Sequence, residues 1–456
     1  MKKFWRVVSG MLLVCLLCTL TLWRQNALPD LSGVTLAWQK AADKIENTAA
    51  TIGNTIGEVI SRPTEAGGGS GSQVYAEYDL SAPLNEDLEG TLCHAFEERA
   101  EKVDISGFHL SAEDVRNTMA QIQYSHPELF YLSARYTYAT AGDTVKEILP
   151  EYLYGEAEIA ARTARYEETL AGIASGVDPA WRDFDKALYL HDYFVRNYTY
   201  DYTYTIRDAS SFFEQKTGVC QAYMLAFIAA GNAIGLEVLP VTSAEMLHAW
   251  NLVKVDGAWY HADITWDDSS VNPAEISYLY FLKSDNGLAA ADAETENPHR
   301  KWSAPVAAPD VRYDDAVYHN SRAAVQKSGD TYYCIVSESS NSGRLRRHGM
   351  LYGGTDITAM VAITTLDGEW MQSNSSYYTA CFSGLCLYDG KLIYNTPNSV
   401  RMYDPASGAD TLLGLFSPSG SSVYGIMELN GKTLLLVFGT SPQDTSFEVR
   451  QYTFSA

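Results

Sequence analysis

The stretch Thr217-Gly218-Val219-Cys220-Gln221-Ala222-Tyr223-Met224-Leu225-Ala226-Phe227-Ile228-Ala229-Ala230 decides how the rest of the chain is interpreted. Thr217 is an acceptable helix N-cap, and the run after it is apolar on every face until Gly235, which suits the position just beyond a helix. A helix that is apolar all round lies buried inside a domain. We therefore expect a central helix that carries Cys220 in its first turn.

The expected position of Cys220 in a helix favours a reactive thiol. With Thr217 as the cap it would be the third residue of the first turn, where backbone N–H groups lack intrahelical acceptors. The positive end of the helix dipole stabilises a thiolate there and lowers the pKa of the thiol. Such a thiolate can act as a nucleophile, and the nearby N–H groups can receive an oxyanion. A structural cysteine would give the same pattern, so a second observation is needed.

That second observation lies downstream, where two aromatic-rich runs flank Asp256-Gly257. If these residues form a two-residue hairpin turn, His248 lies opposite Thr265 and Trp250 lies opposite Asp263. His248 and Asp263 are then diagonal neighbours on one face of the sheet, with Cα atoms about 7–8 Å apart. Thiol activation needs an imidazole base and a carboxylate that fixes its tautomer. The spacing predicts such a pair, and a one-residue bulge would separate it.

Two other histidines compete with His248. His261 falls on the same face of the hairpin and is the alternative base. Its nearest aspartate would again be Asp263, further along its own strand, so we favour His248. His191 lies on the apolar stripe of a helical segment, which is typical of a packed core histidine.

Upstream of this region the pattern is mainly helical. Apolar residues recur along one stripe from Leu84 to Phe96, and Ser111 opens a second helix in capping-box fashion. A short extended piece is expected at residues 130–138. Helical periodicity returns at residues 156–171 and 184–197.

The character changes after Val311 to short β-runs separated by glycine turns. The hairpin-turn signals are Ser328-Gly329, Asp367-Gly368, Asp389-Gly390 and Asn430-Gly431. Some of their spacings fit a propeller blade of about 40–45 residues, but the region is too short for a full propeller. We expect a partial propeller-like array or a small sandwich, with no catalytic constellation in it.

The N-terminal end consists of a short basic segment followed by a long uncharged, mostly apolar run. Basic residues end at Arg6, and the chain then runs to Trp23 without a charge. Positive residues before such a stretch place the N-terminus on the inner side of a membrane and everything after the stretch outside. A cleaved signal peptide and a retained anchor both remain open. The lack of a small-x-small site after the stretch favours the anchor, and the run Gly67–Ser72 has the composition of a flexible tether.

The expected fold class is α+β, in five parts. These are a signal-anchor or transmembrane segment at 1–30, a flexible juxtamembrane linker at 31–73, a helical lead-in at 74–180, a core at 181–303 and a β-rich domain at 311–456. The globular part would lie outside the cytoplasm, attached to the cell membrane by a single span, or be secreted if the first segment is cleaved.

Composition narrows the function. The chain has 456 residues, of which 46% are hydrophobic, and its formal net charge is −23. Disorder is excluded for the bulk of it, and nucleic acid is a poor partner because phosphate binding needs a basic surface. Outside the apolar N-terminal stretch the cysteines show no zinc-ligand spacing. Whether Cys334, Cys381 and Cys386 form a disulfide stays open.

Three motifs, Gly218–Tyr223, His248–Asn251 and Trp259–Asp268, resemble the transglutaminase-like superfamily in residue type, order and spacing. The similarity covers roughly residues 120–285 and does not reach the β-rich domain. Its upstream part, beginning at His126-Pro127, looks like the helical lead-in of bacterial surface members.

The resemblance implies a papain-like α+β core and assigns roles to its residues. Cys220 would be the nucleophile, His248 the general base and acid, and Asp263 the orienting carboxylate. Tyr200 is the candidate for holding the oxyanion. The resemblance implies no cofactor. The calcium-dependent animal members have acidic sites outside the core, and the sequence shows no counterpart of them. Asp267 and Asp268 indicate a turn or cap rather than a metal site, because no further oxygen ligands cluster near them.

Two classes of function follow. The first is a cell-surface thiol enzyme that cuts peptide or side-chain amides through a thioester, followed by hydrolysis or by transfer to an amine. Its partner would be a protein or peptide substrate. The second is a non-catalytic binding or scaffold protein that uses the same fold and the β-rich domain for cell-wall or protein contacts. The oligomeric state is unknown.

Overall fold

The structure, a computed structural model, describes residues 68–71, 80–82, 84–268, 270–291, 298–340, 346–366, 370–372, 378–380, 382–416, 420–441, 444 and 446–455. It is a mixture of helices and strands with several antiparallel sheets. The anchor expected at residues 1–30 lies outside the described residues, as does most of the linker expected at 31–73. No helix within the described ranges has both the length and the apolar character needed to cross a membrane.

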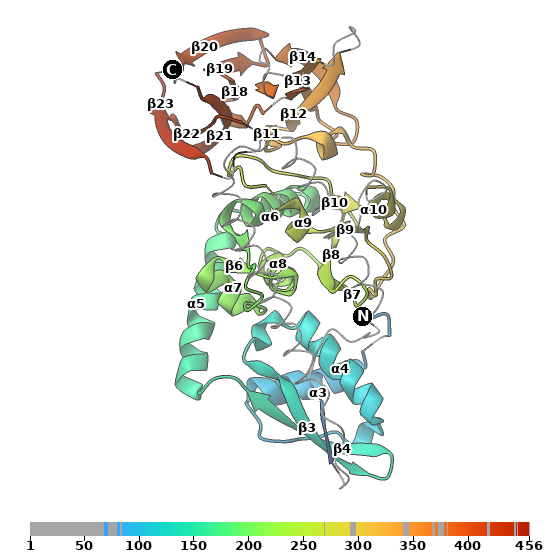
Figure 1. The fold of residues 1–456 in the computed structure, drawn as a ribbon. Helices are drawn as coiled ribbons and strands as arrows, with labels where there is room; N and C mark the ends of the chain where they lie inside the picture. Colours follow the sequence, from blue (N-terminus) through green and yellow to red (C-terminus); the bar gives the residue numbers. More distant parts are fainter. Residues whose placement is uncertain are drawn as a thin grey trace, which may run out of the picture. The chain divides into compact units, whose positions relative to one another are not determined.

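The lead-in combines helices with a small sheet (Figure 1). Its elements are α3 (Glu86–Glu97), α4 (Ala112–Ser125), α5 (Glu156–Ala174), β1 (Gly68–Gly71), β2 (Val103–Asp104), β3 (Leu132–Ala141), β4 (Thr144–Tyr152), η1 (Ser106–Phe108) and η2 (Pro127–Leu129). The predicted stripe is confirmed, since α3 buries Leu88, Leu92 and Phe96. The predicted capping box is also present, because Ser111 and Asp114 exchange side-chain and backbone hydrogen bonds.

The lead-in is less helical than predicted. Its sheet has the order β1-β3-β4-β2, and only part of β3 was expected from the sequence. In β4 the fully buried residues are Val145 and Ile148, and exposed or half-buried polar residues separate them. This spacing does not alternate strictly, so the strand depends on pairing with β3. β1 lies within the segment that its composition assigns to the linker.

The core places one helix against an antiparallel sheet. Its elements are α6 (Asp183–Asn197), β5 (Thr199–Tyr200), α7 (Ala209–Gln215), β6 (Thr217–Gly218), α8 (Cys220–Ala233), β7 (Val238–Ser243), β8 (His248–Val255), β9 (Ala258–Ala262), α9 (Ile264–Asp267), β10 (Phe281–Lys283) and α10 (Asp285–Ala291). The sheet order is β10-β9-β8-β7, and α8 packs on β7 and β8 (Figure 1). Almost every residue of α8 is buried, as its apolar sequence predicts.

The predicted hairpin register is confirmed. Val255 pairs with Ala258, and Leu252 pairs with His261, without a bulge between them. The expected partnership of His248 with Thr265 does not form, because β9 ends at Ala262. The chain then turns into α9, whose N-cap is Asp263.

The start of the central helix differs from the prediction. α8 begins at Cys220, with Val219 as the N-cap. Thr217 does not cap the helix, because Thr217 and Gly218 form β6, which pairs in parallel with β5. Gly218 is required at this close approach, since a Cβ atom there would lie 2.6 Å from the Phe212 ring. Cys220 nevertheless remains in the first turn.

The region after Val311 consists of successive antiparallel meanders. Its elements are η3 (Val317–Asn320), β11 (Gln326–Ser328), β12 (Thr331–Ser340), β13 (Arg346–Gly354), β14 (Val361–Leu366), β15 (Trp370–Gln372), β16 (Tyr378–Ala380), β17 (Leu385–Tyr388), β18 (Lys391–Thr396), β19 (Ser399–Asp404), β20 (Ala409–Leu415), β21 (Ser422–Asn430), β22 (Thr433–Gly439) and β23 (Glu448–Thr453). Strands pair with their sequence neighbours, which is consistent with the predicted β-rich domain.

The glycine-turn signals locate several of these hairpins. Ser328-Gly329, Asp389-Gly390 and Asn430-Gly431 each join two paired strands, as predicted. Asp367-Gly368 lies outside the described residues. Cys334 and Cys386 are free, buried thiols, whereas Cys381 is not among the described residues.

Candidate active site

The side chain of Cys220 lies where α8 meets the start of β8. It is 4% exposed, and its Sγ is 4.0 Å from the backbone oxygen of Leu247. The next residue is His248, and the Cys220 side chain is one of the neighbours that raise the pKa of its imidazole. The helix start therefore brings a thiol to the first residue of the strand that carries the imidazole.

His248 is paired on its other side with Asp263. Its Nε2 donates to Asp263 Oδ2 over 2.5 Å, and both residues are buried. Burial disfavours the charged imidazole, but the Asp263 charge and hydrogen bond, together with Cys220, raise the pKa of His248. Burial likewise opposes ionisation of Asp263, yet its imidazole partners lower the pKa of that carboxyl. The pair is therefore charged, a protonated imidazole beside a carboxylate.

Aromatic rings surround this ion pair. The His248 ring stacks against Trp250 and Trp266, with centroid distances of 5.5 Å and 5.3 Å. Because both indole rings lie within 24° of parallel to it, they restrict rotation of the imidazole. Trp250 is 1% exposed. Low exposure of the ion pair strengthens its electrostatic interaction.

Asp263 accepts hydrogen bonds from three groups. Besides His248, its Oδ2 accepts from Nε2 of His299 over 3.0 Å. Its Oδ1 accepts from the backbone N–H of Trp266 over 3.1 Å, which caps α9. Sequence reasoning missed His299, because the residue belongs to no motif and its approach to Asp263 depends on the path of a distant segment.

The competing histidine, His261, has other partners. Its Nδ1 accepts a hydrogen bond from Trp250 Nε1 over 3.0 Å, and its Nε2 donates to Asp285 over 2.9 Å. These roles fix a neutral imidazole, and burial lowers the pKa of His261. With both ring nitrogens engaged, His261 is not available to deprotonate Cys220.

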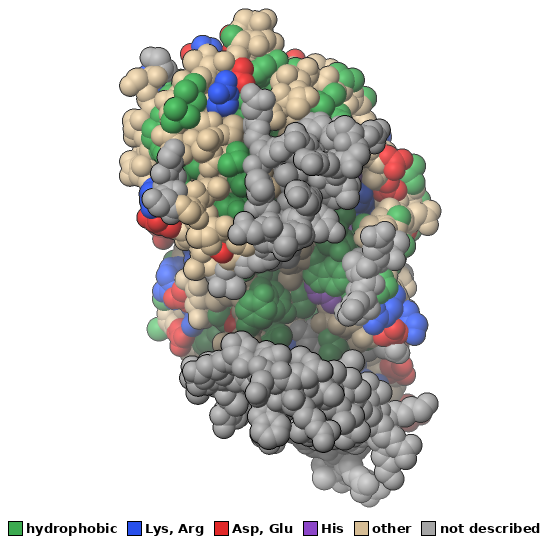
Figure 2. Space-filling view, turned by 45° about the horizontal axis from the view of Figure 1, so that its top comes forward, with side chains coloured by type: hydrophobic (Ala, Val, Ile, Leu, Met, Phe, Trp, Pro, Cys, Tyr) green, Lys and Arg blue, Asp and Glu red, His purple; other side chains and the backbone are tan. Residues whose placement is uncertain are grey.

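Tyr200 lies beside the chain that leads into α8. It pairs with Gly218 in the β5–β6 bridge, and its ring contacts Tyr202 and Tyr204 at 5.2 Å and 6.3 Å. Tyr202 and Tyr204 are exposed. Figure 2 shows a face of the molecule on which hydrophobic side chains gather beside visible histidine atoms.

The loop that displays these tyrosines is fixed by Asp201. Its carboxylate accepts hydrogen bonds from the backbone N–H groups of Thr203, Thr205 and Ile206, at 2.8–3.0 Å. Burial opposes the charge on Asp201, but these donors lower the pKa of the carboxyl. Ile206 in turn accepts from the N–H of Val219, the N-cap of α8. The Asp201 loop thus holds the start of the helix that carries the thiol.

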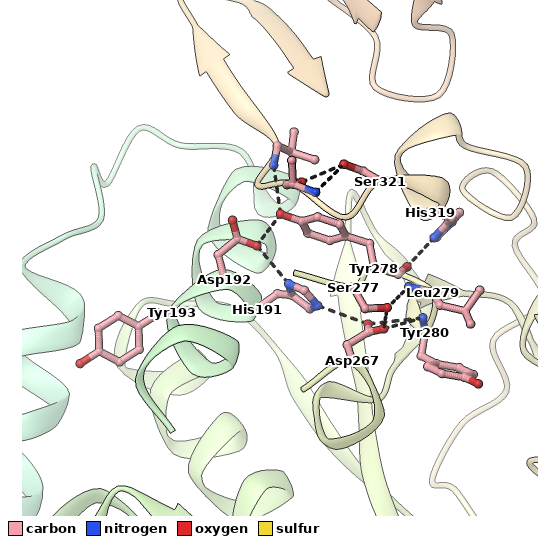
Figure 3. A network of polar contacts seen from close by, with 12 residues as sticks. His191, Asp192, Tyr193, Asp267, Ser277, Tyr278, Leu279, Tyr280, His319 and Ser321 are labelled. Atoms are coloured by element: carbon pink, nitrogen blue, oxygen red, sulfur yellow. Dashed lines mark hydrogen bonds and ion pairs between the residues drawn. The ribbon is translucent and has the colours of Figure 1, made fainter. Parts of the chain in front are cut away.

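Another buried histidine, His191, is hydrogen-bonded to Asp267 of α9 (Figure 3). Its Nδ1 lies 3.1 Å from Asp192 Oδ1, and its Nε2 lies 3.3 Å from Asp267 Oδ2. The two carboxyl groups that face the ring nitrogens favour the charged imidazole, although burial raises the pKa of Asp267. Despite burial, the two carboxylates raise the pKa of His191 to about 9.

This arrangement around His191 extends to the segment before β10. The Tyr278 hydroxyl donates to Asp192 over 2.8 Å and accepts from the backbone of Val325. Asp267 also accepts from Ser277 over 2.9 Å. His191 is the packed histidine that its apolar stripe predicts. Asp267 is buried as the last residue of α9, and Asp268 is the C-cap of that helix, in agreement with the predicted turn or cap.

One group in the described part of the chain has the spacing to hold a metal ion, with ligand atoms of His248, Asp263 and His299 within 4.8 Å of one another. The hydrogen bonds given above account for that spacing, so we assign no metal to it. Proton exchange with a thiol would use the ring nitrogen of His248 that does not donate to Asp263.

Comparison with known proteins supports the resemblance of the core to the transglutaminase-like superfamily. Residues 171–264 match the family model of the transglutaminase-like superfamily, which confirms the resemblance over that stretch. The matched range contains Cys220, His248 and Asp263 and ends before His299. No curated protein matches the chain.

Proposed function

We propose that the transglutaminase-like domain makes this chain a thiol enzyme acting on peptide or side-chain amides through a Cys220–His248–Asp263 triad. The observation that carries the proposal is the position of His248. It directly follows Leu247, whose backbone oxygen lies 4.0 Å from Cys220 Sγ, and its imidazole donates to buried Asp263. A protonated imidazole beside a thiol stabilises the thiolate, which is the nucleophilic form.

The reaction would run in two halves. In the first, Cys220 Sγ attacks the amide carbonyl carbon, the C–N bond breaks, and His248 gives its proton to the leaving amine. This step leaves a thioester on Cys220. In the second half, His248 takes a proton from water or from an amine, whose oxygen or nitrogen attacks the thioester. The C–S bond breaks, and a carboxylic acid or a new amide leaves.

The oxyanion formed in each half needs hydrogen-bond donors. The N–H of Cys220 belongs to the first turn of α8 and so has no intrahelical acceptor. Its direction toward the helix start supports a role as one donor. Tyr200, beside the chain that leads into α8, is the proposed side-chain donor.

The proposed setting is the cell surface. Basic residues before the uncharged run that ends at Trp23 favour a retained single-pass anchor with the globular part outside the cytoplasm. The expected partner is a protein or peptide substrate. The second half-reaction needs only water or an amine, so the proposal invokes no cofactor.

The experiment that tests this proposal uses a labelled primary amine and a mixture of proteins. The wild-type chain should incorporate the amine into protein or release free amine from it. The Cys220→Ala variant should do neither, while Cys334→Ala, which removes a buried thiol elsewhere, should behave as wild type. Equal activity in the Cys220→Ala variant would contradict the thioester route. Absence of both reactions in the wild type would favour the binding or scaffold function.

A further inference from the structure

One oxygen of Asp263 serves two imidazoles. Oδ2 accepts from His248 Nε2 at 2.5 Å and from His299 Nε2 at 3.0 Å. Both histidines are buried, at 7% and 4% exposure, and Asp263 is fully buried. Water therefore does not stand in for either donor, and each hydrogen bond draws on the same carboxylate charge.

The segment that carries His299 is anchored to the strand end beside the thiol. Ser303 and Thr242 exchange two backbone hydrogen bonds, at 2.8 Å and 3.1 Å, next to the end of β7. The Ser243 hydroxyl donates to the backbone oxygen of Arg300 over 2.8 Å. The guanidinium of Arg300 pairs with Glu245 over 2.7 Å. These contacts fix the position of His299 relative to the end of β7.

Ring contacts set the orientation of the His299 imidazole. Its centroid lies 4.1 Å from Trp266 and 4.9 Å from Trp250, the two rings that also stack on His248. Tyr280 lies 5.3 Å away. Because the same indoles position both imidazoles, the two Nε2 atoms are directed to one acceptor.

The charged and titratable groups around this centre come from several elements. α8 contributes Cys220, β9 contributes neutral His261 with its partner Asp285, and the segment before β10 contributes Tyr280. The ion pairs of Glu245 with Arg300 and Lys301 lie next to His299 in the chain and at the surface. Among these groups, His299 and His248 are the two side chains that donate to Asp263 Oδ2.

We infer that His299 is a positioning residue that shares the Asp263 carboxylate with His248 and thereby limits how strongly that carboxylate holds the proton of His248. A carboxylate with one donor stabilises a protonated imidazole fully, whereas a second donor at the same oxygen takes part of that stabilisation. His248 must release its proton to the leaving amine in the proposed reaction, so a shared carboxylate favours that transfer.

This inference rests on the proposed function, and its test uses the modification of Cys220 by iodoacetate on the full chain. The reagent is an anion, so its rate falls when His248 loses its proton at alkaline pH, and mass spectrometry locates the modified thiol. The variants are His299→Phe, which keeps a ring but no donor, and His299→Gln, which retains an N–H donor.

The expected result is a shift of the alkaline fall in rate to higher pH by about one unit in His299→Phe. His299→Gln should keep the wild-type position. An unchanged profile in His299→Phe would overturn the inference, and so would an equal shift in both variants, because the donor would then be irrelevant. A wild-type Cys220 that reacts no faster than a free thiol would overturn the proposed function instead.

A measurement on the wild type alone covers the case in which His299→Phe does not fold. Nitrogen-15 NMR of the histidine rings should find the His299 proton on Nε2, with slow exchange, because that atom donates to Asp263. A His299 ring with its proton on Nδ1 alone would overturn the sharing of the carboxylate.

Discussion

At the scale of single residues, His248 and His261 show how partners decide the role of a side chain. Both lie on the same face of one hairpin, yet His248 donates to Asp263 and has its pKa raised by Asp263 and Cys220, while His261 is held neutral between Trp250 and Asp285. The ring nitrogens of His261 are both occupied by other partners, which leaves His248 as the proposed proton-exchange partner of Cys220.

Exchanging each histidine for glutamine separates the two roles. His248→Gln should lower the rate of Cys220 alkylation by iodoacetamide at pH 6.5 at least about tenfold, because the thiolate loses its charged partner. His261→Gln should change that rate by less than about twofold. Thermal unfolding of both variants serves as the control for folding. A larger effect in His261→Gln than in His248→Gln would reverse the assignment.

Asp263 gives a prediction about protonation. Asp263→Asn keeps an acceptor for the backbone N–H of Trp266 at the start of α9 but removes the charge that raises the pKa of His248. The imidazole of His248 should then titrate near or below its ordinary value of about 6.5. NMR titration of the ring measures this. An unmoved titration would show that the carboxylate does not hold the proton.

At the scale of elements, the start of α8 depends on the Asp201 loop. The carboxylate of Asp201 orders the loop, and the loop oxygen of Ile206 accepts from the N-cap Val219. Leu247, which lies between the turn and β8, has a positive φ of 53°, a conformation that is costly for a leucine. The thiol is thus carried by Cys220, the first residue of α8, and the imidazole by His248, the first residue of β8. The Asp201 loop fixes the start of α8, and the backbone conformation of Leu247 precedes the start of β8.

Removing the Asp201 carboxylate should therefore weaken the fold and the site together. Asp201→Ala should lower the free energy of unfolding by about 3 kcal/mol, because buried N–H groups lose a charged acceptor. Asp356→Ala is the matched control, since its carboxylate accepts from the N–H and hydroxyl of Thr358 at an exposed turn. Its cost should stay below about 1 kcal/mol. Chemical denaturation measures both, and equal costs would contradict the role of the loop.

The parts of the site that could be predicted are those that local geometry fixes. Asp256-Gly257 determined the hairpin register, and the register placed His248 near Asp263, as the structure confirms. The parts that could not be predicted depend on distant contacts. His299 reaches Asp263 only because its segment pairs with Thr242, and β4 is a strand because β3 pairs with it.

At the scale of the whole molecule, buried charges tie the core to the β region. Asp185 of α6 accepts from Lys327 over 2.6 Å and from the Tyr332 hydroxyl over 2.5 Å. The Tyr278 hydroxyl forms a second link, because it donates to Asp192, a partner of His191, and accepts from the backbone N–H of Val325 (Figure 3). The stability of the folded chain should therefore respond to the protonation of His191, whose pKa is raised.

His191 predicts the direction of one pH dependence. Its pKa is raised from an ordinary value of 6.5 to about 9, so its stabilising contribution is complete below about pH 6.5 and is lost as pH rises through about 9. The contribution amounts to about 3 kcal/mol. Between about pH 6.5 and pH 9 the unfolding free energy of the wild type should fall by about 3 kcal/mol more than that of His191→Gln. Parallel pH curves for the two proteins would contradict a charged His191.

The central claim is that Cys220 is activated by His248, and its pH-dependent reactivity tests this most directly. An unperturbed thiol with a pKa of about 8.5 is about 1% ionised at pH 6.5. Burial raises the pKa of Cys334 and of Cys386 to about 12, so these thiols should stay unmodified. We predict that iodoacetamide modifies Cys220 at pH 6.5 at least about tenfold faster than free cysteine. A Cys220 rate that follows that of free cysteine from pH 6 to pH 9 would contradict the account.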